Sequence, residues 1–262
     1  MRASARIVAE ADGRGGTRLA VLRGESPLLL RRTGPRSGGR GLTVHLVGGA
    51  AGPLRGDDLQ LSVEVGPGAW LDVRSVAASL ALPGRDGAPP SRLRVDAVVA
   101  AGAVLRWWPE PLIAAAGCHH QAITDVEIAD GASVLWRDDQ VCGRHGEGAG
   151  DVRTDTTIRY AGRTLYRHEL AFGPGAPGWS GAAVLGGGRA AGSVVLAGPQ
   201  LPAPALLGGD AAVMPLAGPG MLATAVGPDI RPVRAALDPI CAAYPVAAAT
   251  AEPNPDLQPA TR

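Results

Sequence analysis

The strongest constraint on the fold is a unit that occurs three times: a strand-like run, a glycine-centred turn and a second strand-like run. It reads LSVEVGPGAWLDV, then VDAVVAAGAVLRW, then ITDVEIADGASVLW, and its turn glycines, Gly68, Gly102 and Gly131, are 34 and 29 residues apart. Each unit can cover only one face with Val, Leu and Ile, so it must stack on a neighbour to bury that face. The repeat therefore predicts a mainly β fold of stacked β-hairpins arranged in β-helical layers.

Further strand signals flank these units. ARIVAEADGRGGTRLAVLRG alternates apolar and polar residues around a glycine-rich turn, and SPLLLRRTG adds a short apolar run. VRTDTTIRYAGRTLYRHELAFG is a fourth unit that turns at AGR, and SVVLAG and AAVMPLAG follow as strand-like runs. The composition agrees, because 38 Gly, 23 Pro and only 3% aromatic residues favour many turns and a core of Ala, Val and Leu.

The C-terminal part of the sequence changes character. Residues 219–226 (PGMLATAV) and 229–244 (DIRPVRAALDPICAAY) are predicted to be helices, and Asp229 is a suitable N-cap for the second. In that second segment the apolar residues recur at helical spacing, namely at Val233, Leu237, Ile240 and Tyr244. Pro239 lies inside the segment and is expected to kink or divide the helix.

The domain organisation is simple, because no composition break marks a linker. We expect a single β-rich domain over residues 1–248, with its helical part at about 219–244, and a disordered tail at 249–262. An acid and a glycine-rich turn stand where a signal peptide needs its apolar region. No apolar run approaches the roughly 20 residues of a membrane helix. These features predict a soluble cytoplasmic protein.

Charge and missing motifs exclude several functions. The sequence contains no lysine, which excludes a phosphate-binding GxxxxGK[ST] loop and Schiff-base chemistry. With 25 basic and 24 acidic residues and no basic stripe with interleaved aromatics, nucleic acid is not an expected partner. Neither a GxSxG nor an HExxH motif is present. A non-enzymatic binding or scaffold role is therefore the expected one.

One segment, AGCHHQAITDVEIADGASVLWRDDQVCGRHGEG, contains the residue types of a metal site. Its candidate ligands are Cys118, His119, His120, Cys142 and His145. A structural zinc site usually shows two close ligand pairs, whereas adjacent histidines point to opposite sides of a strand. We interpret the segment as a polar β-hairpin rather than a closed metal site, and a transient metal contact stays open.

Two readings of other classes stay open on the residues alone. One is a small metal-dependent enzyme that uses His119, Cys142 and His145 as ligands. The other is a carbohydrate-binding module that stacks sugars on Trp107, Trp108 and Trp136, although tryptophans at strand ends more often fill a core.

An ordered set of motifs carries a family likeness. The runs VHLVGGAAGPLRGDDLQLSVEVGPGAWLDV and LRWWPEPLIAAAGCHHQAITDVEIADGASVLWRDDQVCGRHGEG contain GD-x-L-x-L, PGA, PEP, GA-x-x-x-W and GRHGE in this order. In this combination the chain resembles the UreD (UreH) family of urease accessory proteins. The resemblance implies a non-enzymatic maturation factor with a β-helical fold that binds UreF, the GTPase UreG and apo-urease. It also implies no permanent cofactor and no small-molecule substrate, with nickel in transit towards the urease.

The resemblance also suggests functional positions. The polar residues that match family positions, and that could pass a hydrated nickel ion, are Asp57, Ser75, Ser79, Asp138, Arg144 and Glu147. Pro111 and Leu80 depart from the family, because many relatives have Glu and Lys there. Docking of UreF is expected in the C-terminal part, with the candidate contact residues Arg231, Arg234, Leu237 and Tyr244.

Overall fold

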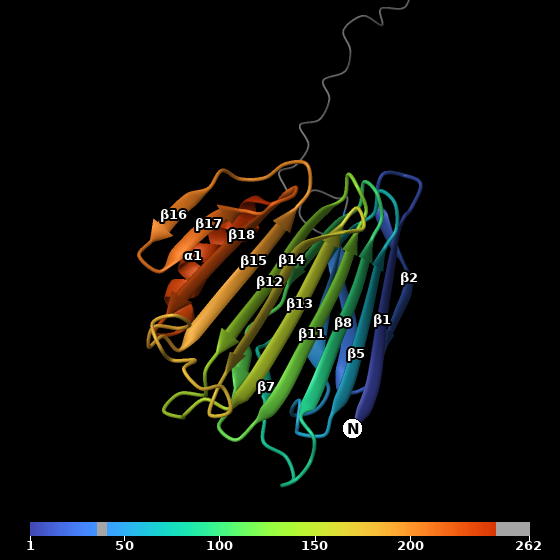
Figure 1. Cartoon of the computed structure of the whole chain (residues 1–262). Coiled ribbons are helices and arrows are strands. Elements are labelled where there is room, and N and C mark those ends of the chain that lie inside the picture. Colours follow the sequence, from blue (N-terminus) through green and yellow to red (C-terminus); the bar gives the residue numbers. More distant parts are fainter. Residues whose placement is uncertain (36–40, 245–262) are drawn as a thin grey trace, which may run out of the picture.

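The computed structural model describes residues 1–35 and 41–244, and these residues form two facing β-sheets and a C-terminal helix (Figure 1). Sheet A has seven strands in the spatial order β14 (Arg163–Phe172), β13 (Asp151–Tyr160), β11 (His119–Ile128), β8 (Ser91–Val99), β5 (Asp58–Val65), β1 (Arg2–Ala11) and β2 (Thr17–Gly24). The expected tail at 249–262 and the end of the expected domain at 245–248 lie outside the described residues.

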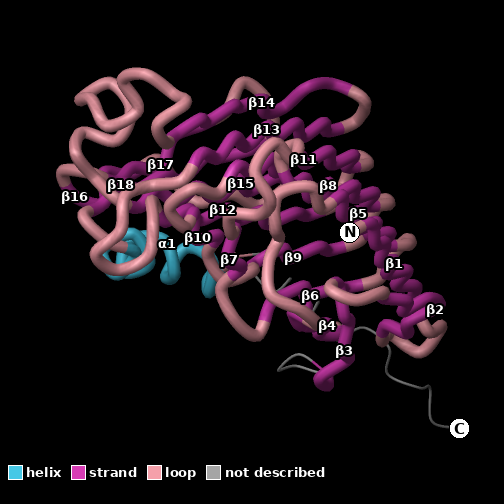
Figure 2. The backbone as a smooth tube through the Cα atoms, turned by 90° about the horizontal axis from the view of Figure 1, so that it is seen from below, coloured by secondary structure: helices cyan, strands magenta, loops and turns pink. Residues whose placement is uncertain are grey.

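Sheet B faces sheet A across the core, as the view along the strands shows (Figure 2). Its main path runs in the order β16 (Ala205–Gly208), β17 (Ala211–Pro215), β18 (Gly220–Gly227), β15 (Ala190–Ala197), β12 (Ser133–Val141), β9 (Val104–Trp108), β6 (Trp70–Ser75), β4 (Leu42–Gly48) and β3 (Leu28–Pro35). Two short strands complete it, β10 (Leu112–Ala114) beside β12 and β7 (Ser79–Ala81) beside β10.

The repeated unit is a solenoid coil and not a hairpin. Its first strand lies in sheet A and its second in sheet B, so β5 continues into β6, β8 into β9 and β11 into β12. Equivalent strands of successive coils pair in parallel, as β5 does with β8 and β8 with β11. The predicted layers are confirmed as a β-solenoid of about four turns. The prediction that residues 116–148 form a β-hairpin was wrong, because β11 and β12 belong to opposite sheets.

The turns that join the sheets explain the repeated glycines. In each turn the glycine has a positive φ, +69° at Gly68, +68° at Gly102 and +73° at Gly131, which other residues rarely adopt. The turns also stack, because the N–H of Val104 donates to the carbonyl of Ala69 in the coil before, and the coil after repeats this bond. The glycine spacing therefore marks one coil of the solenoid.

True hairpins occur at the ends of the stack. The strand pairs β1–β2, β3–β4 and β13–β14 are antiparallel. The N-terminal pattern predicted the first of these pairs and the AGR turn predicted the last. Each of these hairpins joins the parallel stack through one of its strands, namely β1 beside β5, β4 beside β6 and β13 beside β11.

The core between the sheets is apolar at the glycine-turn end. Val63, Ala97, Val126 and Ile158 are neighbours across sheet A and are all buried. The next set of neighbours, two residues earlier in each strand, changes along the sheet from Leu61 and Val95 to Thr124 and Thr156. The interior therefore becomes polar away from the glycine turns, at the β11 and β13 end of sheet A.

The C-terminal helix α1 (Ile230–Ala243) confirms the prediction for residues 229–244. Asp229 is its N-cap and accepts a hydrogen bond of 2.8 Å from the N–H of Arg231. The helix continues through Pro239 and is not divided there. Its apolar side, with Val233, Leu237 and Cys241, is buried against β12, β15 and β18 of sheet B.

The predicted helix at residues 219–226 was wrong, because this segment is strand β18. Met221, Ala223 and Ala225 alternate with less buried residues, which is the period of two that a strand shows. Strands β15 and β17 pair with β18 on its two sides and satisfy its backbone. Small residues such as Ala are compatible with a helix or a strand, so pairing with β15 and β17 decides that this segment is a strand.

A buried network of charges fixes α1 on sheet B. Arg137 of β12 is fully buried and its guanidinium lies 2.8 Å from a carboxylate oxygen of Asp139 and 2.5 Å from one of Asp238 in α1. Arg106 of β9 donates to the carbonyl of Cys241 at 2.6 Å and lies 3.5 Å from Asp72. Because each cation has an acidic partner, the network can stay ionised in the core.

Trp108 also contacts the cations of this network. The guanidinium groups of Arg74, Arg106 and Arg137 lie over its ring at 4.4, 5.5 and 5.4 Å from the centroid. The negative face of an indole ring attracts cations. Trp108 therefore helps to stabilise the buried guanidinium groups of Arg106 and Arg137, which contact α1.

Gly192 of β15 permits the close approach of α1. A Cβ at this position would lie 2.6 Å from Oδ1 of Asp139, 2.6 Å from Val233 and 2.8 Å from Leu237. We expect Gly192→Ala to lower the free energy of unfolding by about 1–3 kcal/mol, because the helix must shift. Urea unfolding measures this, with Gly209→Ala as the control since nothing lies within 4 Å of its Cβ. Equal losses in both variants would contradict this account of the packing.

Candidate functional site

The site begins at two interruptions of sheet B. The first half of β12 pairs with β9 and its end pairs with β10, while residues 109–111 (PEP) between them leave the ladder. Residues 76–78 interrupt the neighbouring layer in the same way, between β6 and β7. Because proline has no N–H for a ladder bond, the PEP sequence favours such a break. The interruptions leave a cavity of about 410 Å³ between the sheets.

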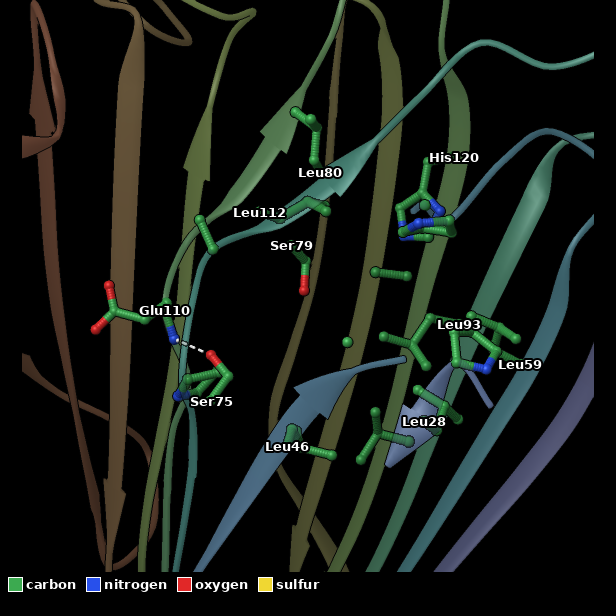
Figure 3. Close-up of a pocket in the computed structure, with 18 of the residues that line it drawn as sticks. Leu28, Leu46, Leu59, Ser75, Ser79, Leu80, Leu93, Glu110, Leu112 and His120 are labelled. Carbon is green, nitrogen blue, oxygen red and sulfur yellow. Dashed lines mark hydrogen bonds between the residues drawn. The ribbon is translucent and has the colours of Figure 1, made fainter. Parts of the chain in front are cut away.

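The cavity has apolar walls with a polar region (Figure 3). The apolar walls come from both sheets and include Leu28, Leu46, Leu59, Leu80, Leu93 and Leu112. The polar groups that line it include Ser75, Ser79, Glu110, His120, Thr124, Asp138, Gln140, Thr154 and Thr156. An apolar cavity with a few converging polar groups is the usual form of a ligand site.

Asp138 is the carboxyl group that β12 turns into this cavity, between Trp136 and Gln140 on the same face. Burial raises its pKa to about 7, while hydrogen bonds from Trp136 and Thr156 oppose the shift and the nearby Asp139 adds to it. The indole Nε1 of Trp136 donates to Asp138 at 3.1 Å. Near neutral pH this carboxyl group is therefore divided between its protonated and its ionised form.

The PEP loop connects the cavity to helix α1. The N–H of Glu110 donates to Oγ of Ser75 at 2.8 Å (Figure 3). Ser75 in turn donates to the carbonyl of Ala77 at 3.0 Å. The Glu110 carboxylate accepts two hydrogen bonds of 2.8 Å from the guanidinium of Arg234 in α1. The cavity rim and the helix are thus one connected unit.

Three of the six positions suggested by the family likeness line this cavity, namely Ser75, Ser79 and Asp138. Asp57 is buried elsewhere, where it accepts hydrogen bonds from the Met1 ammonium group at 2.6 Å and from the N–H of Leu54 at 2.9 Å. These two bonds fix the turn at residues 54–57, before β5.

Arg144 and Glu147 form an ion pair with each other in the turn after β12. Their pairing lowers the pKa of Glu147 and raises that of Arg144. Glu147 also accepts from the N–H of Ala116 at 3.3 Å, which joins this turn to the one before β11. This pair lies outside the cavity lining.

The candidate metal ligands do not gather at one point. Cys118 and Cys142 are buried among apolar residues, and burial raises their pKa to about 11 and about 12, which keeps the thiols protonated. His145 is exposed in the turn after β12, and His119 points away from the cavity that His120 lines. Over residues 1–35 and 41–244, no group of three or more His, Cys, Asp and Glu side chains could hold a metal ion.

The aromatic candidates for sugar stacking are core residues. The rings of Trp107 and Trp136 stack on each other with centroids 4.8 Å apart, and both side chains are buried. Trp108 holds the guanidinium groups under α1. These tryptophans therefore form no exposed platform.

The predicted docking residues occupy both sides of α1. Arg231 is exposed and pairs with Asp229, whereas Arg234 pairs with Glu110. Leu237 and Tyr244 are buried against sheet B, and the Tyr244 hydroxyl donates to the carbonyl of Ala197 at 2.6 Å. The buried pair holds the helix in place.

Sequence reasoning missed five polar residues of the cavity, namely Glu110, Thr124, Gln140, Thr154 and Thr156. The signal for two of the threonines was present, because Thr154 and Thr156 alternate with charged residues in VRTDTTIRY and so share the inner face of a strand. Glu110 was visible only as part of the PEP motif.

The fold and site together define a class of protein: a β-solenoid with a cavity between its two sheets and a C-terminal helix packed on sheet B. A sequence model of the family "UreD urease accessory protein" matches residues 1–259. The chain belongs to the UreD family. It is an accessory factor of urease maturation and not itself an enzyme.

Named relatives agree with this assignment. The chain is 50% identical over 245 residues to urease accessory protein UreD 3 of Streptomyces griseus subsp. griseus, covering 91% of this chain and 95% of the relative. It is 47% identical over 243 residues to the urease accessory proteins UreD of Streptomyces avermitilis and of Streptomyces coelicolor. These alignments cover 91% of this chain in both cases, and 95% and 94% of the relatives. Within the described part of the chain, no helix is long and apolar enough to span a membrane.

Proposed function

We propose that this chain works in the cytoplasm with UreF and the GTPase UreG to insert nickel into apo-urease. Membership of the UreD family supports a role in urease maturation. The observation that carries the nickel step is the internal cavity with the Asp138 carboxyl group on its wall. Because a chain without lysine has no P-loop, the nucleotide chemistry belongs to UreG in this proposal.

Nickel is bound only in transit in this proposal. Asp138, Ser75 and Ser79 offer oxygen atoms to an ion that keeps most of its water molecules. The apolar leucine walls offer none, so the ion is held weakly and can leave. Protonation of Asp138 near neutral pH adds a means of release.

The remaining family positions support this route from outside the cavity. Asp57 fixes the turn at residues 54–57, next to Pro53 of the cavity wall. The Arg144–Glu147 pair fixes the turn that follows β12, the strand that contains Asp138. We assign these three residues to holding the walls in place.

Helix α1 is the proposed docking element for UreF. Its outer side presents Arg231, and Arg234 connects the helix to Glu110 on the cavity rim. Leu237 and Tyr244 fix the helix to sheet B through their buried side chains. A partner that binds this helix thereby lies close to the cavity.

Co-expression tests the function. Urease, UreF and UreG are produced with and without this chain under limiting nickel, and nickel per urease is measured in the purified enzyme. We expect nickel-poor, inactive urease without the chain and loaded urease with it. A chain with Arg153→Ala, an exposed residue of sheet A, serves as the matched control and should activate fully. Equal nickel contents with and without the chain would reject the proposed function.

A further inference from the structure

His120 lines the cavity with a buried side chain, and one of its two ring nitrogens has no hydrogen-bond partner. It is 1% exposed, and its Nε2 atom has no partner. The residue lies at the start of β11, on the face that lines the cavity (Figure 3). A buried polar atom without a hydrogen-bond partner lowers the stability of the fold unless a ligand or water molecule satisfies it.

The other ring nitrogen of His120 is fixed by Ser91 of β8. Its Nδ1 lies 2.9 Å from Oγ of Ser91, and that Oγ lies 3.3 Å from the carbonyl of His119. The carbonyl can only accept, so the serine hydroxyl donates to it and accepts from Nδ1–H. The proton is therefore on Nδ1, which leaves the lone pair of Nε2 without a hydrogen-bond donor.

This arrangement is the one that metal-binding histidines use. A neutral imidazole with one N–H bound to an oxygen atom has its other nitrogen oriented and ready as a ligand. Burial lowers the pKa of His120 to about 4, so the ring stays neutral at neutral pH. Imidazole binds nickel, copper, cobalt and zinc, whereas magnesium and calcium prefer oxygen.

We propose that Nε2 of His120 is a binding site for a divalent transition-metal ion inside the cavity, with Ser91 as the residue that orients the ring. The inference rests on the proposed function for the identity of the ion, which is then nickel. Asp138 lines the same cavity and supplies a negative charge, while water completes the coordination. With a single nitrogen ligand from the chain, we expect binding to be reversible.

The test isolates His120 from the other four histidines of the chain. A full-length background variant has glutamine at each of them, namely His45, His119, His145 and His168. Equilibrium dialysis against NiCl₂ compares this background with its His120→Gln and His120→Leu derivatives, and circular dichroism confirms that all three fold. Dialysis with MgCl₂ tests the preference for the metal class.

We expect the background to bind nickel and both derivatives to lose that site, with no competition from a tenfold excess of magnesium. Ser91→Ala in the background should weaken nickel binding by about 10- to 100-fold, the usual effect of removing a group that orients a metal ligand. Equal nickel binding by the background and its folded His120 derivatives would overturn the proposal and leave a water molecule at Nε2. Because dialysis needs no urease, this result is independent of the co-expression result.

Discussion

Replacing Arg137 with alanine should lower the free energy of unfolding by about 3–5 kcal/mol, because it leaves buried acids without their cation. The Asp139 side chain is 1% exposed, and its Oδ2 accepts a hydrogen bond of 2.9 Å from Nε of Arg137 and lies 2.8 Å from Nη2 of the same guanidinium group. Asp238 of α1 loses its partner in the same variant. For a chain of this size the loss corresponds to a fall in melting temperature on the order of 10 °C.

Urea unfolding and thiol labelling measure this prediction. Cys241 is fully buried on the side of α1 that packs against sheet B, so its labelling by a thiol reagent reports detachment of α1. The control is Arg153→Ala, which removes an exposed ion pair with Glu169 and should cost less than about 1 kcal/mol. Replacing Arg137, Asp139 and Asp238 together by apolar residues should restore much of the stability. Wild-type stability and labelling in Arg137→Ala would show that the network does not fix the helix.

This network also shows the limit of reading strands from sequence. Arg137 and Asp139 alternate with Trp136 and Asp138 in β12, which is the pattern of a strand with one solvent-facing side. Here that outer side is covered by α1, a segment about 100 residues further along the chain. Alternation shows that two faces differ, but it does not show which element covers each face.

The repeated units could be predicted because their signal is local. A glycine with positive φ between two apolar runs is visible at Gly68, Gly102 and Gly131. Whether the second run folds back on the first or crosses to another sheet depends on partners from other coils. For this reason the β-helical layers were predicted correctly, while the hairpin interpretation of each unit was wrong.

The cavity depends on tertiary structure even more. Asp138, Ser75 and Ser79 were found only through the family likeness, and His120 was grouped with thiols that lie elsewhere. The cavity exists because two strand interruptions lie in adjacent layers, at residues 76–78 and 109–111. No pattern within one segment shows that two such breaks meet.

The second large effect is expected from Asp138. Asp138→Leu should reduce the nickel loaded into urease at limiting nickel by at least about tenfold, because it removes the carboxyl group of the cavity. Asp138→Asn keeps the shape and one oxygen ligand and should lose less. Asp155→Asn is the matched control, since this residue lies on the outer face of β13, where it pairs weakly with Arg167. Full loading with a folded Asp138→Leu chain would remove this residue from the nickel route.

The pH dependence of stability provides a second test of the same carboxyl group. Its pKa is about 7 in the folded chain and about 3.9 when unfolded, so the folded state binds the extra proton between these values. The wild-type chain should therefore lose stability as pH rises from about 4 to 7, by at most about 4 kcal/mol, and then remain level. Asp138→Asn cannot ionise and should lack this loss, so its stability relative to wild type should rise over that interval. Parallel stability curves for the two proteins from pH 4 to 8 would mean that Asp138 ionises normally, and proton exchange at Asp138 could then not release the metal ion.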